Sequence, residues 1–300
     1  MYLDPSRKKL IVIVGPTAVG KTAAAIRLAR HYNTEIISAD SRQIFNELTI
    51  GTAKPSPEEL AAVPHHFINS RSIEEPYDAA QFGIDALQLI EDLFERHDHV
   101  IMCGGSGLYI RAVCEGFDEI PAVAPEIRGG LVYDYEIHGI AALQAKLKLL
   151  DPDLFATIDT KNPQRLMRAL EVVMGTGKSI TSFRQGKMRE HNFSILKFGL
   201  MLSRDELYAR IDARMDTMIA DGLFAEAEGL YPFKDHNALQ TVGYQEIFGF
   251  MDGKYDQEEA IRLLKRNSRR YAKRQLTWFK RDPEIVWMNP ANIGQIIEAV

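Results

Sequence analysis

The 300-residue sequence contains little cysteine and no long apolar run. Its two cysteines, Cys103 and Cys114, are too few for a disulfide framework or a cysteine-based zinc site, and we expect both to be small core residues. The longest apolar run, residues 10–14, is far shorter than the roughly 20 residues that cross a bilayer. The N-terminal stretch MYLDPSRKK lacks the apolar segment of a secretory signal. We therefore expect a cytosolic protein with no membrane span, no structural metal and no obligate protein partner.

The composition is that of an ordinary globular protein. Hydrophobic residues make up 46% and charged residues 26%, values that disfavour disordered, collagen-like and disulfide-scaffold classes. The length suits one large α/β domain, or a domain that carries a substantial insertion. Either arrangement is large enough to bury a core unaided.

The charge is unevenly distributed along the chain. The 36 basic and 41 acidic side chains give a net charge of −5, which alone argues against a nucleic-acid partner. Residues 262–281, however, carry nine basic side chains and no acidic one, interleaved with Tyr271, Trp278 and Phe279. Such a stripe is typical of a surface that contacts a phosphate backbone, although a solvated helix face explains the same pattern. The basic residues are Arg262, Lys265, Arg266, Arg269, Arg270, Lys273, Arg274, Lys280 and Arg281.

Short apolar runs alternate with amphipathic stretches in the first hundred residues. This pattern predicts βα units and a mostly parallel sheet. Residues 51–77, rich in proline, serine and glutamate, are expected to form a long ordered loop of the kind that is usually functional. The expected strands are 10–14, 35–38 and 99–103, and the expected helices are about 21–32, 79–96 and 106–115.

Strand signals disappear after about residue 118. Pro121 and Pro125 begin this segment, and Asn162 followed by Pro163 predicts the N-cap and first position of a helix. We interpret 118–192 as a helical insertion between two parts of one core, residues 1–117 and 193–300. Helices are expected near 138–150, 163–174, 204–220, 236–251 and 256–280 and at the C-terminus, with strands at 194–202 and 284–288.

The strongest motif is a G-x-x-x-x-G-K-[ST] loop between a buried strand and an alanine-rich helix. Its glycines let backbone N–H groups converge on phosphate oxygens at a helix N-terminus, its lysine adds a positive charge, and its threonine hydroxyl can ligate Mg²⁺. A second, partial match, MGTGKS at 174–179, lacks the first glycine and a preceding strand, so we expect a helix C-cap and turn there. The residues of the full motif are Gly15, Pro16, Thr17, Ala18, Val19, Gly20, Lys21 and Thr22.

The loop and the alternating elements together predict an α/β fold of the P-loop NTPase type. It would have a mostly parallel sheet flanked by helices and a helical insertion domain.

Ligands of such sheets bind at the carboxyl ends of the strands. Asp40 and Ser106 each follow a predicted strand and are expected at that edge. Asp40 can serve as a base, a hydrogen-bond acceptor or a Mg²⁺ ligand through water, or simply as a loop or N-cap residue. Ser106 can contact substrate or only cap its helix.

Arg214 is the most informative single charge. In the helix that begins at the expected capping box of Ser203 and Glu206, it lies about 20° from the centre of the apolar stripe, using 100° per residue. A charge there needs a partner, either an anionic ligand in a cleft or a structural carboxylate. Arg168, in contrast, projects away from the apolar face of its own helix, so by itself we interpret it as a surface charge. The histidine pair at 65–66 lacks a third ligand at suitable spacing, so no metal is expected there.

Taken together, these segments resemble one family, the tRNA dimethylallyltransferases, also called tRNA isopentenyltransferases. The resemblance spans nearly the whole chain, and IGTAKP and KRQLTWFKR are its most specific parts. It implies transfer of a dimethylallyl group from dimethylallyl diphosphate to the exocyclic amine of the adenosine immediately 3′ of the anticodon in tRNA. The similar stretches are GPTAVGKT (15–22), ISADSRQIF (37–45), IGTAKPS (50–56), PHHFIN (64–69), GGSGLYIRA (104–112), NPQRLMRALEV (162–172), RIDARMDTMIADGL (210–223), QTVGYQE (240–246) and YAKRQLTWFKR (271–281).

The resemblance also implies roles for individual residues. Asp40, Arg214 and Thr22 would be catalytic, residues 17–22 would hold the diphosphate, and Thr22 would ligate Mg²⁺. One departure is Gln245, where many relatives carry an arginine. The implied contacts with the anticodon stem-loop of tRNA are Asp40, Ser41, Arg42, Gln43, Ser106, Arg128, Gln164, Arg165, Leu166, Met167, Arg168, Lys273, Arg274 and Gln275.

Two other classes of function fit parts of the sequence. A small-molecule P-loop kinase would use ATP, with Asp40 as base and Arg214 as a phosphoryl clamp, but it leaves the basic stripe at 262–281 without a role. A nucleotide-driven tRNA-binding switch would use that stripe, but no additional sensor motif is present.

Overall fold

The computed structural model describes residues 8–184, 186 and 189–300. These residues belong to two compact units. The first combines the chain up to Gly116 with Glu190–Val300, and the second is Phe117–Arg189. The boundaries lie within three residues of those expected for a helical insertion at 118–192. No helix among the described residues is long and apolar enough to cross a membrane.

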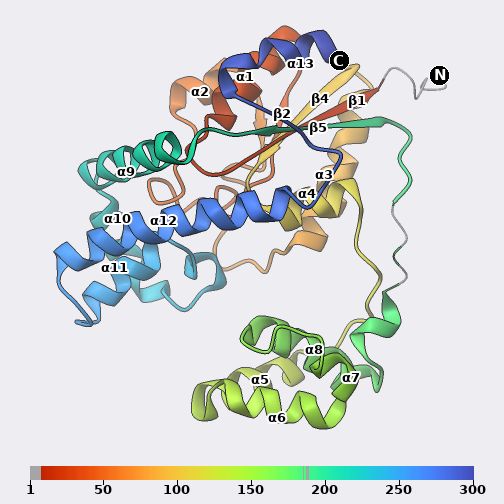
Figure 1. Ribbon diagram of the computed structural model, residues 1–300, viewed down its shortest axis with the longest axis vertical. Coiled ribbons are helices and arrows are strands. Elements are labelled where there is room, and N and C mark those ends of the chain that lie inside the picture. Colours follow the sequence, from red (N-terminus) through yellow and green to blue (C-terminus); the bar gives the residue numbers. More distant parts are fainter. Residues whose placement is uncertain (1–7, 185, 187–188) are drawn as a thin grey trace. The chain divides into compact units, whose positions relative to one another are not determined.

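The first unit is built around a six-stranded parallel sheet with the order β3-β2-β4-β1-β5-β6. Figure 1 labels its four central strands, β2, β4, β1 and β5. β1 lies in its interior, and the side chains of residues 10–14 are fully buried. The predicted α/β fold with a parallel sheet of the P-loop NTPase type is confirmed. The strands are β1 Lys9–Val14, β2 Ile36–Ser38, β3 His65–His66, β4 His99–Gly104, β5 Ser194–Leu200 and β6 Val286–Met288.

Helices cover both faces of this sheet because successive side chains of a strand point to opposite faces. Leu10, Val12 and Val14 of β1 pack with residues of α3 and α4, whereas Ile11 and Ile13 pack with residues of α1, α9 and α13. The helices of this unit are α1 Lys21–His31, α2 Pro57–Ala62, α3 Ala79–Phe94, α4 Gly107–Cys114, α9 Arg204–Ala220, α10 Leu223–Leu230, α11 Tyr244–Met251, α12 Gln257–Phe279 and α13 Gly294–Ala299.

Three expectations for this unit are wrong in detail. The expected loop at 51–77 contains the short helix α2 and the two-residue strand β3. The helix expected at 236–251 begins only at Tyr244, because Gly243 has a φ of 109° that interrupts helical geometry. The helix α10 was not expected; it begins after Gly222, whose φ of 103° separates it from α9.

The second unit is a small helical bundle with its own core. The two predicted helices are present, and Asn162 caps α8 by accepting a hydrogen bond from the Arg165 backbone N–H at 3.2 Å. The turn expected at 174–179 is also confirmed, because Gly177 ends α8 in the left-handed conformation. The first helix of the bundle, α5, was missed; Leu131 is its one fully buried residue, so its apolar periodicity is weak. The helices are α5 Pro125–His138, α6 Ile140–Leu150, α7 Pro152–Phe155 and α8 Pro163–Thr176.

Candidate active site

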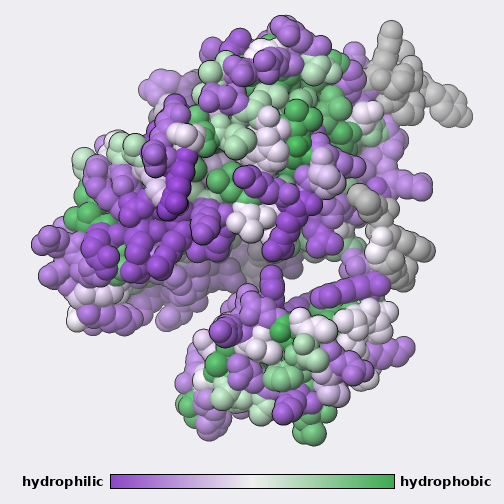
Figure 2. Space-filling model, in the orientation of Figure 1, coloured by the Kyte–Doolittle hydropathy of each residue, from purple (hydrophilic) through white to green (hydrophobic). Residues whose placement is uncertain are grey.

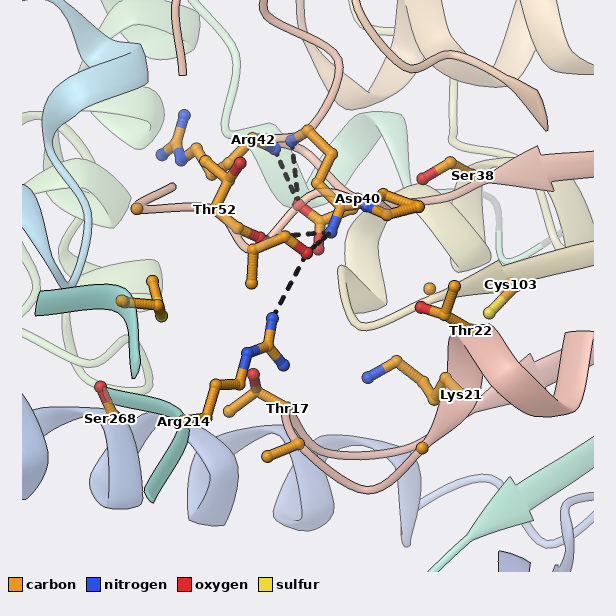
Figure 3. Close-up of a pocket in the computed structure, with 18 of the residues that line it drawn as sticks. Thr17, Lys21, Thr22, Ser38, Asp40, Arg42, Thr52, Cys103, Arg214 and Ser268 are labelled. Atoms are coloured by element: carbon orange, nitrogen blue, oxygen red, sulfur yellow. Dashed lines mark hydrogen bonds between the residues drawn. The ribbon is translucent and has the colours of Figure 1, made fainter. Parts of the chain in front are cut away.

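A cavity of about 430 Å³ opens at the carboxyl ends of β1, β2 and β4 (Figure 3). All of its lining residues belong to the first unit. They include residues of the P-loop, the segment after β2, the 51–55 loop, α9 and α12. Residues that are far apart in the sequence therefore meet at the edge of the sheet where ligands of α/β folds bind.

The P-loop joins β1 to α1, as predicted, and its geometry depends on glycine. Gly15 has a φ of 150°, and a Cβ there would lie 2.7 Å from the Leu200 carbonyl oxygen. Gly20, with a φ of 102°, ends the loop at the N-cap of α1. Ala18 also has a positive φ, at 63°, which an alanine rarely adopts. Because the loop is held in this strained form, the N-terminus of α1 faces the cavity and can bind an anion.

Lys21 supplies the positive charge of the P-loop. Its Nζ donates to the Pro16 carbonyl oxygen at 2.8 Å, which holds the side chain across the loop. Burial lowers the pKa of Lys21 to about 8, although the negative charge of the nearby Asp40 opposes this shift. Burial also raises the pKa of the Cys103 thiol to about 11, so this group stays neutral. Cys103 was expected in the core but is half-buried and lines the cavity, whereas Cys114 is a core residue as expected.

Asp40 lies on the opposite side of the cavity from Lys21 and Arg214 in Figure 3. Its Oδ1 accepts hydrogen bonds from the backbone N–H groups of Arg42 at 2.9 Å and Gln43 at 3.3 Å. These bonds fix the carboxylate as an Asx turn would. No hydrogen bond from the described residues occupies its Oδ2. Oδ1 of Asp40 therefore stabilises the loop, and Oδ2 is available to accept a hydrogen bond from a ligand.

Ser106 is not a simple helix cap. It stands at the N-cap position of α4 but makes no side-chain cap hydrogen bond. Its Oγ instead accepts from the Ser41 backbone N–H at 2.9 Å and donates to the Ser41 Oγ at 3.1 Å. It thereby ties the segment that carries Asp40 to the loop after β4.

Arg214 projects from α9 into the same cavity (Figure 3). One of its terminal nitrogens donates to the Ala53 carbonyl oxygen at 3.3 Å. Among the described residues, no carboxylate lies within ion-pair distance of it. Burial lowers its pKa, and Asp40 and Glu59 oppose this shift from a distance. Of the two alternatives for Arg214, the geometry thus favours an arginine in a cleft that can bind an anionic ligand over an arginine that pairs with a structural carboxylate.

The 49–54 loop that faces Arg214 is held by a residue that sequence reasoning missed. Glu226 of α10 accepts from the backbone N–H groups of Thr49, Ile50 and Gly51 at 3.1, 2.7 and 2.8 Å. It also accepts from the Tyr244 hydroxyl at 2.7 Å. No local pattern marks Glu226, since its backbone partners in the 49–51 segment are about 175 residues away in the sequence.

Gln43 contributes to the same loop from the other side. Its Nε2 donates to the carbonyl oxygens of Thr52 at 3.2 Å and Ala53 at 3.1 Å. The amide group of Gln43, which was expected to contact tRNA, therefore has an internal role through its nitrogen. Arg42, from the same segment, lines the cavity, and burial lowers its pKa.

Gln275 corrects a prediction. It was expected to contact tRNA together with Lys273 and Arg274, but its side chain is only 7% exposed, whereas these two neighbours are exposed. Its Oε1 accepts from the Thr17 backbone N–H at 2.8 Å, and its Nε2 donates to the Gly105 carbonyl oxygen at 3.0 Å. Gln275 is buried beside exposed neighbours because successive residues of a helix are rotated by about 100°, so that adjacent side chains point in different directions.

The basic stripe at 262–281, which covers most of α12 and the two residues after it, divides into two groups. Three of its nine cations pair with carboxylates: Arg262 with Glu259 of its own helix, and Lys265 and Arg269 with acidic residues of α9. Figure 2, in the orientation of Figure 1, shows largely hydrophilic surface over α12. The six for which the described residues provide no ion pair are Arg266, Arg270, Lys273, Arg274, Lys280 and Arg281.

In the helical unit, predicted tRNA contacts gather around Glu171, which is 5% exposed. Arg128 pairs with its Oε1 and donates to the Gln164 Oε1 at 3.1 Å. Arg168 pairs with its Oε2 at 3.1 Å, so it is not the lone surface charge that its helix face suggested.

Two neighbours of these residues are corrections. Leu166 and Met167, also expected to contact tRNA, are 0% and 3% exposed because the apolar face of α8 packs into the core of the helical unit. Their side chains are therefore not accessible to an RNA surface. Arg165, in contrast, is exposed, with Asp159 3.9 Å away.

The fold and cavity define an α/β protein of the P-loop class whose pocket is suited to a phosphorylated ligand. The family model described as IPP transferase matches residues 43–282. The tRNA dimethylallyltransferase of Cytophaga hutchinsonii is 54% identical, with 96% of this chain and 95% of the relative covered. That of Christiangramia forsetii is 52% identical, with 97% of both chains covered.

Solved structures of similar proteins support the same family. The tRNA isopentenylpyrophosphate transferase of Bacillus halodurans has a TM-score of 0.71 and 39% identity, covering 96% of this chain and 94% of its own. A eukaryotic dimethylallyltransferase that acts on tRNA has a TM-score of 0.78 and 27% identity, covering 94% and 74%. The chain belongs to the tRNA dimethylallyltransferase family, and the resemblance found in the sequence is confirmed. It is thus a prenyl-transferring enzyme, and the small-molecule kinase is not favoured.

Proposed function

We propose that the protein transfers the dimethylallyl group of dimethylallyl diphosphate to the exocyclic amine of the adenosine immediately 3′ of the anticodon in tRNA. The observation that carries this proposal is the composition of the cavity wall. The P-loop, Lys21 and Arg214 provide a site for a diphosphate, and Asp40 faces it with one carboxylate oxygen available to an amine. With this arrangement, the leaving group and the nucleophile would meet in one cavity.

In this reaction the bond between the allylic carbon and the diphosphate oxygen breaks, and its electron pair leaves with the diphosphate. Negative charge therefore develops on the leaving group as the carbon becomes cationic. The P-loop N–H groups, Lys21 and Arg214 are already oriented toward the cavity and can stabilise this charge without reorganisation. Arg214 fits this role because the described residues give it no carboxylate partner to exchange for the diphosphate.

The nucleophile is the adenine amine, whose lone pair is weakened by conjugation with the ring. Its nitrogen forms the new C–N bond, and the amine proton passes to Asp40 as general base. The two backbone hydrogen bonds to Oδ1 fix the Asp40 carboxylate, so that Oδ2 can accept from the amine and orient it. Ser106 supports this geometry by holding Ser41, the next residue of the segment.

The cavity also fits Mg²⁺ bound together with the diphosphate. The hydroxyls of Thr22 and Ser38 and the Asp40 carboxylate line it, and oxygen atoms are the ligands that Mg²⁺ prefers. Among the described residues there is no group of three or more His, Cys, Asp or Glu side chains that could hold a metal by itself. We therefore propose Thr22 as the protein ligand, with substrate oxygens and water completing the shell. When bound, Mg²⁺ would neutralise part of the diphosphate charge.

The tRNA would be held by two basic surfaces. One is formed by the six cations of the 262–281 stripe for which the described residues give no ion pair, and the other by Arg128 and Arg168 of the helical unit. The target base must leave its stack to enter the cavity, at a cost of about a few kcal/mol. Contacts to the phosphate backbone can offset this cost. Since its substrate is tRNA, we place the reaction in the cytosol.

The test is to incubate the protein with Mg²⁺, labelled dimethylallyl diphosphate and unmodified tRNA, beside a parallel ATP hydrolysis assay. We expect label in tRNA and no tRNA-dependent hydrolysis of ATP. A matched tRNA in which the target adenosine is replaced by guanosine should stay unlabelled, and so should wild-type tRNA incubated with Asp40→Asn. Label in the guanosine tRNA would overturn the proposed acceptor, and ATP hydrolysis without transfer would overturn the reaction.

A further inference from the structure

Gln275 joins two loops that follow neighbouring strands at the cavity edge of the sheet. Its Oε1 accepts from the Thr17 backbone N–H of the P-loop, and its Nε2 donates to the Gly105 carbonyl oxygen after β4. β1 and β4 are neighbours in the sheet, so their following loops emerge side by side. The Gln275 amide bridges these loops from a third element, α12, and uses its donor and its acceptor at once.

The bridge continues from Gly105 to Asp40 through a short series of contacts. Ser106, the next residue after Gly105, holds the backbone N–H and the hydroxyl of Ser41. Ser41 directly follows Asp40, whose own carboxylate is fixed by the backbone of the same segment. Gln275 therefore links the proposed diphosphate site at Thr17 to the proposed amine acceptor at Asp40.

We propose that Gln275 is a positioning residue that sets the spacing between the diphosphate cradle and Asp40. This inference rests on the proposed function, because spacing matters only if both substrates react across the cavity. Gln275 touches neither reacting atom. Its effect is to hold two loops in register, and a misplacement of about 1 Å between reacting groups can cost roughly 100-fold in rate.

Gly105 provides an independent way to disturb the same bridge. A Cβ at this position would lie 2.3 Å from the Gln275 Nε2, closer than two such atoms can approach. Gly105 does not have a positive φ, so alanine is compatible with its backbone. The effect of Gly105→Ala should therefore come from displacing the Gln275 amide rather than from backbone strain.

The test compares Gln275→Ala, Gly105→Ala and the double variant in the complete protein. We expect kcat at saturating tRNA and dimethylallyl diphosphate to fall about 10- to 100-fold in each single variant. The Kd for tRNA should stay within about twofold, because Gln275 is buried. The double variant should be no slower than Gln275→Ala, since removing the amide removes the atom with which the new methyl group collides.

Two control variants use the same types of substitution. Gly229→Ala adds a methyl group that meets no described atom within 4 Å. Thr277→Ala removes a hydroxyl whose one hydrogen bond among the described residues goes to the Lys273 carbonyl oxygen of its own helix. Both should keep the wild-type kcat. Melting temperatures identify any single variant that does not fold. If one of the two does not, the kcat of the other single variant is used as the test.

The outcomes distinguish a failure of the positioning role from a failure of the proposed function. If wild-type protein labels no tRNA, the proposed function is wrong. If wild type is active and Gln275→Ala keeps its kcat but loses tRNA affinity, Gln275 contacts tRNA and the positioning role is wrong. Strictly multiplicative losses in kcat for the double variant would also overturn the bridge, because they would show that Gly105 and Gln275 act independently.

Discussion

At the scale of single residues, the site depends on how each charge is partnered. Arg214 and Lys21 lie in one cavity, and their ordinary interactions in the free protein are with carbonyl oxygens rather than carboxylates. Burial lowers the pKa of both. An incoming diphosphate would replace lost hydration with direct charge pairing, which is why we assign both to the leaving group.

Arg214→Gln tests this assignment. The variant should lose about 1.5–3 kcal/mol of donor binding or transition-state stabilisation, the usual scale for a hydrogen bond to a charged group. Affinity for tRNA alone should barely change. Donor affinity, turnover and thermal stability are measured on one preparation. A less stable variant with normal donor affinity would show that Arg214 serves the fold instead.

The lowered pKa of Lys21 predicts a pH dependence. Only the protonated amine attracts a diphosphate, and a base whose pKa is depressed loses its proton as the pH rises through that value. Donor affinity in the free enzyme should therefore weaken above about pH 8. The measurement is the donor Kd from about pH 7 to 9.5, with Lys21→Arg as control, since arginine stays charged throughout. An equal decline in both proteins would assign the titration to another group.

At the scale of elements, α12 combines opposite roles on its two faces. Its inward face carries Gln275, Ala272 and Phe279, which are buried, and its outward face carries exposed basic side chains. Some of those cations are neutralised by acidic residues of α9, which the sequence of α12 alone does not show. The surface available to RNA is therefore narrower than the nine-residue stripe.

This division predicts different effects for cations of the same helix. Replacing Lys273 and Arg274 with alanine should weaken tRNA binding and reduce the salt slope by roughly one to two units, if each contacts a phosphate. Arg262→Ala should leave that slope unchanged, because both carboxylate oxygens of Glu259 pair with this one guanidinium. The arginines of the helical unit differ, since Arg128 and Arg168 share the single carboxylate of Glu171 and keep a net positive charge. Binding is measured across a series of salt concentrations. A wild-type slope in the double variant would assign Lys273 and Arg274 to packing.

At the scale of the whole molecule, we expect the two units to have different roles in the reaction. Every residue that lines the cavity belongs to the first unit, whereas the second has a separate core and a cluster of arginines around Glu171. A net charge of −5 is compatible with an RNA substrate because basic side chains are gathered locally in both units.

Arg128→Ala tests this division of roles. It leaves Arg168 to pair with the buried Glu171, so the helical unit should remain folded. We expect weaker tRNA binding with a salt slope reduced by about one unit, and unchanged affinity for dimethylallyl diphosphate. Lys148→Ala, on an exposed position of α6, is the matched control. A change in donor affinity would contradict the independence of the cavity from this unit.

The amino-acid sequence by itself determined the features that depend on neighbouring residues. The P-loop follows from a buried strand, two glycines with positive φ and a helix start, all within a few positions. The N-cap at Asn162 and the C-cap at Gly177 are equally local. Where the local signal is weak, prediction failed, as it did for α5, in which only Leu131 is fully buried.

The tertiary structure decided which side chains remain available for function. Gln275 was grouped with Lys273 and Arg274, yet it bonds to Thr17 across 258 positions. Glu226 holds a loop about 175 positions away, and Leu166 and Met167 turn into a core. Local patterns record propensity and periodicity, whereas the partner of a buried polar group is set by how distant segments pack. Packing alone therefore separates residues that position the site from those that face solvent.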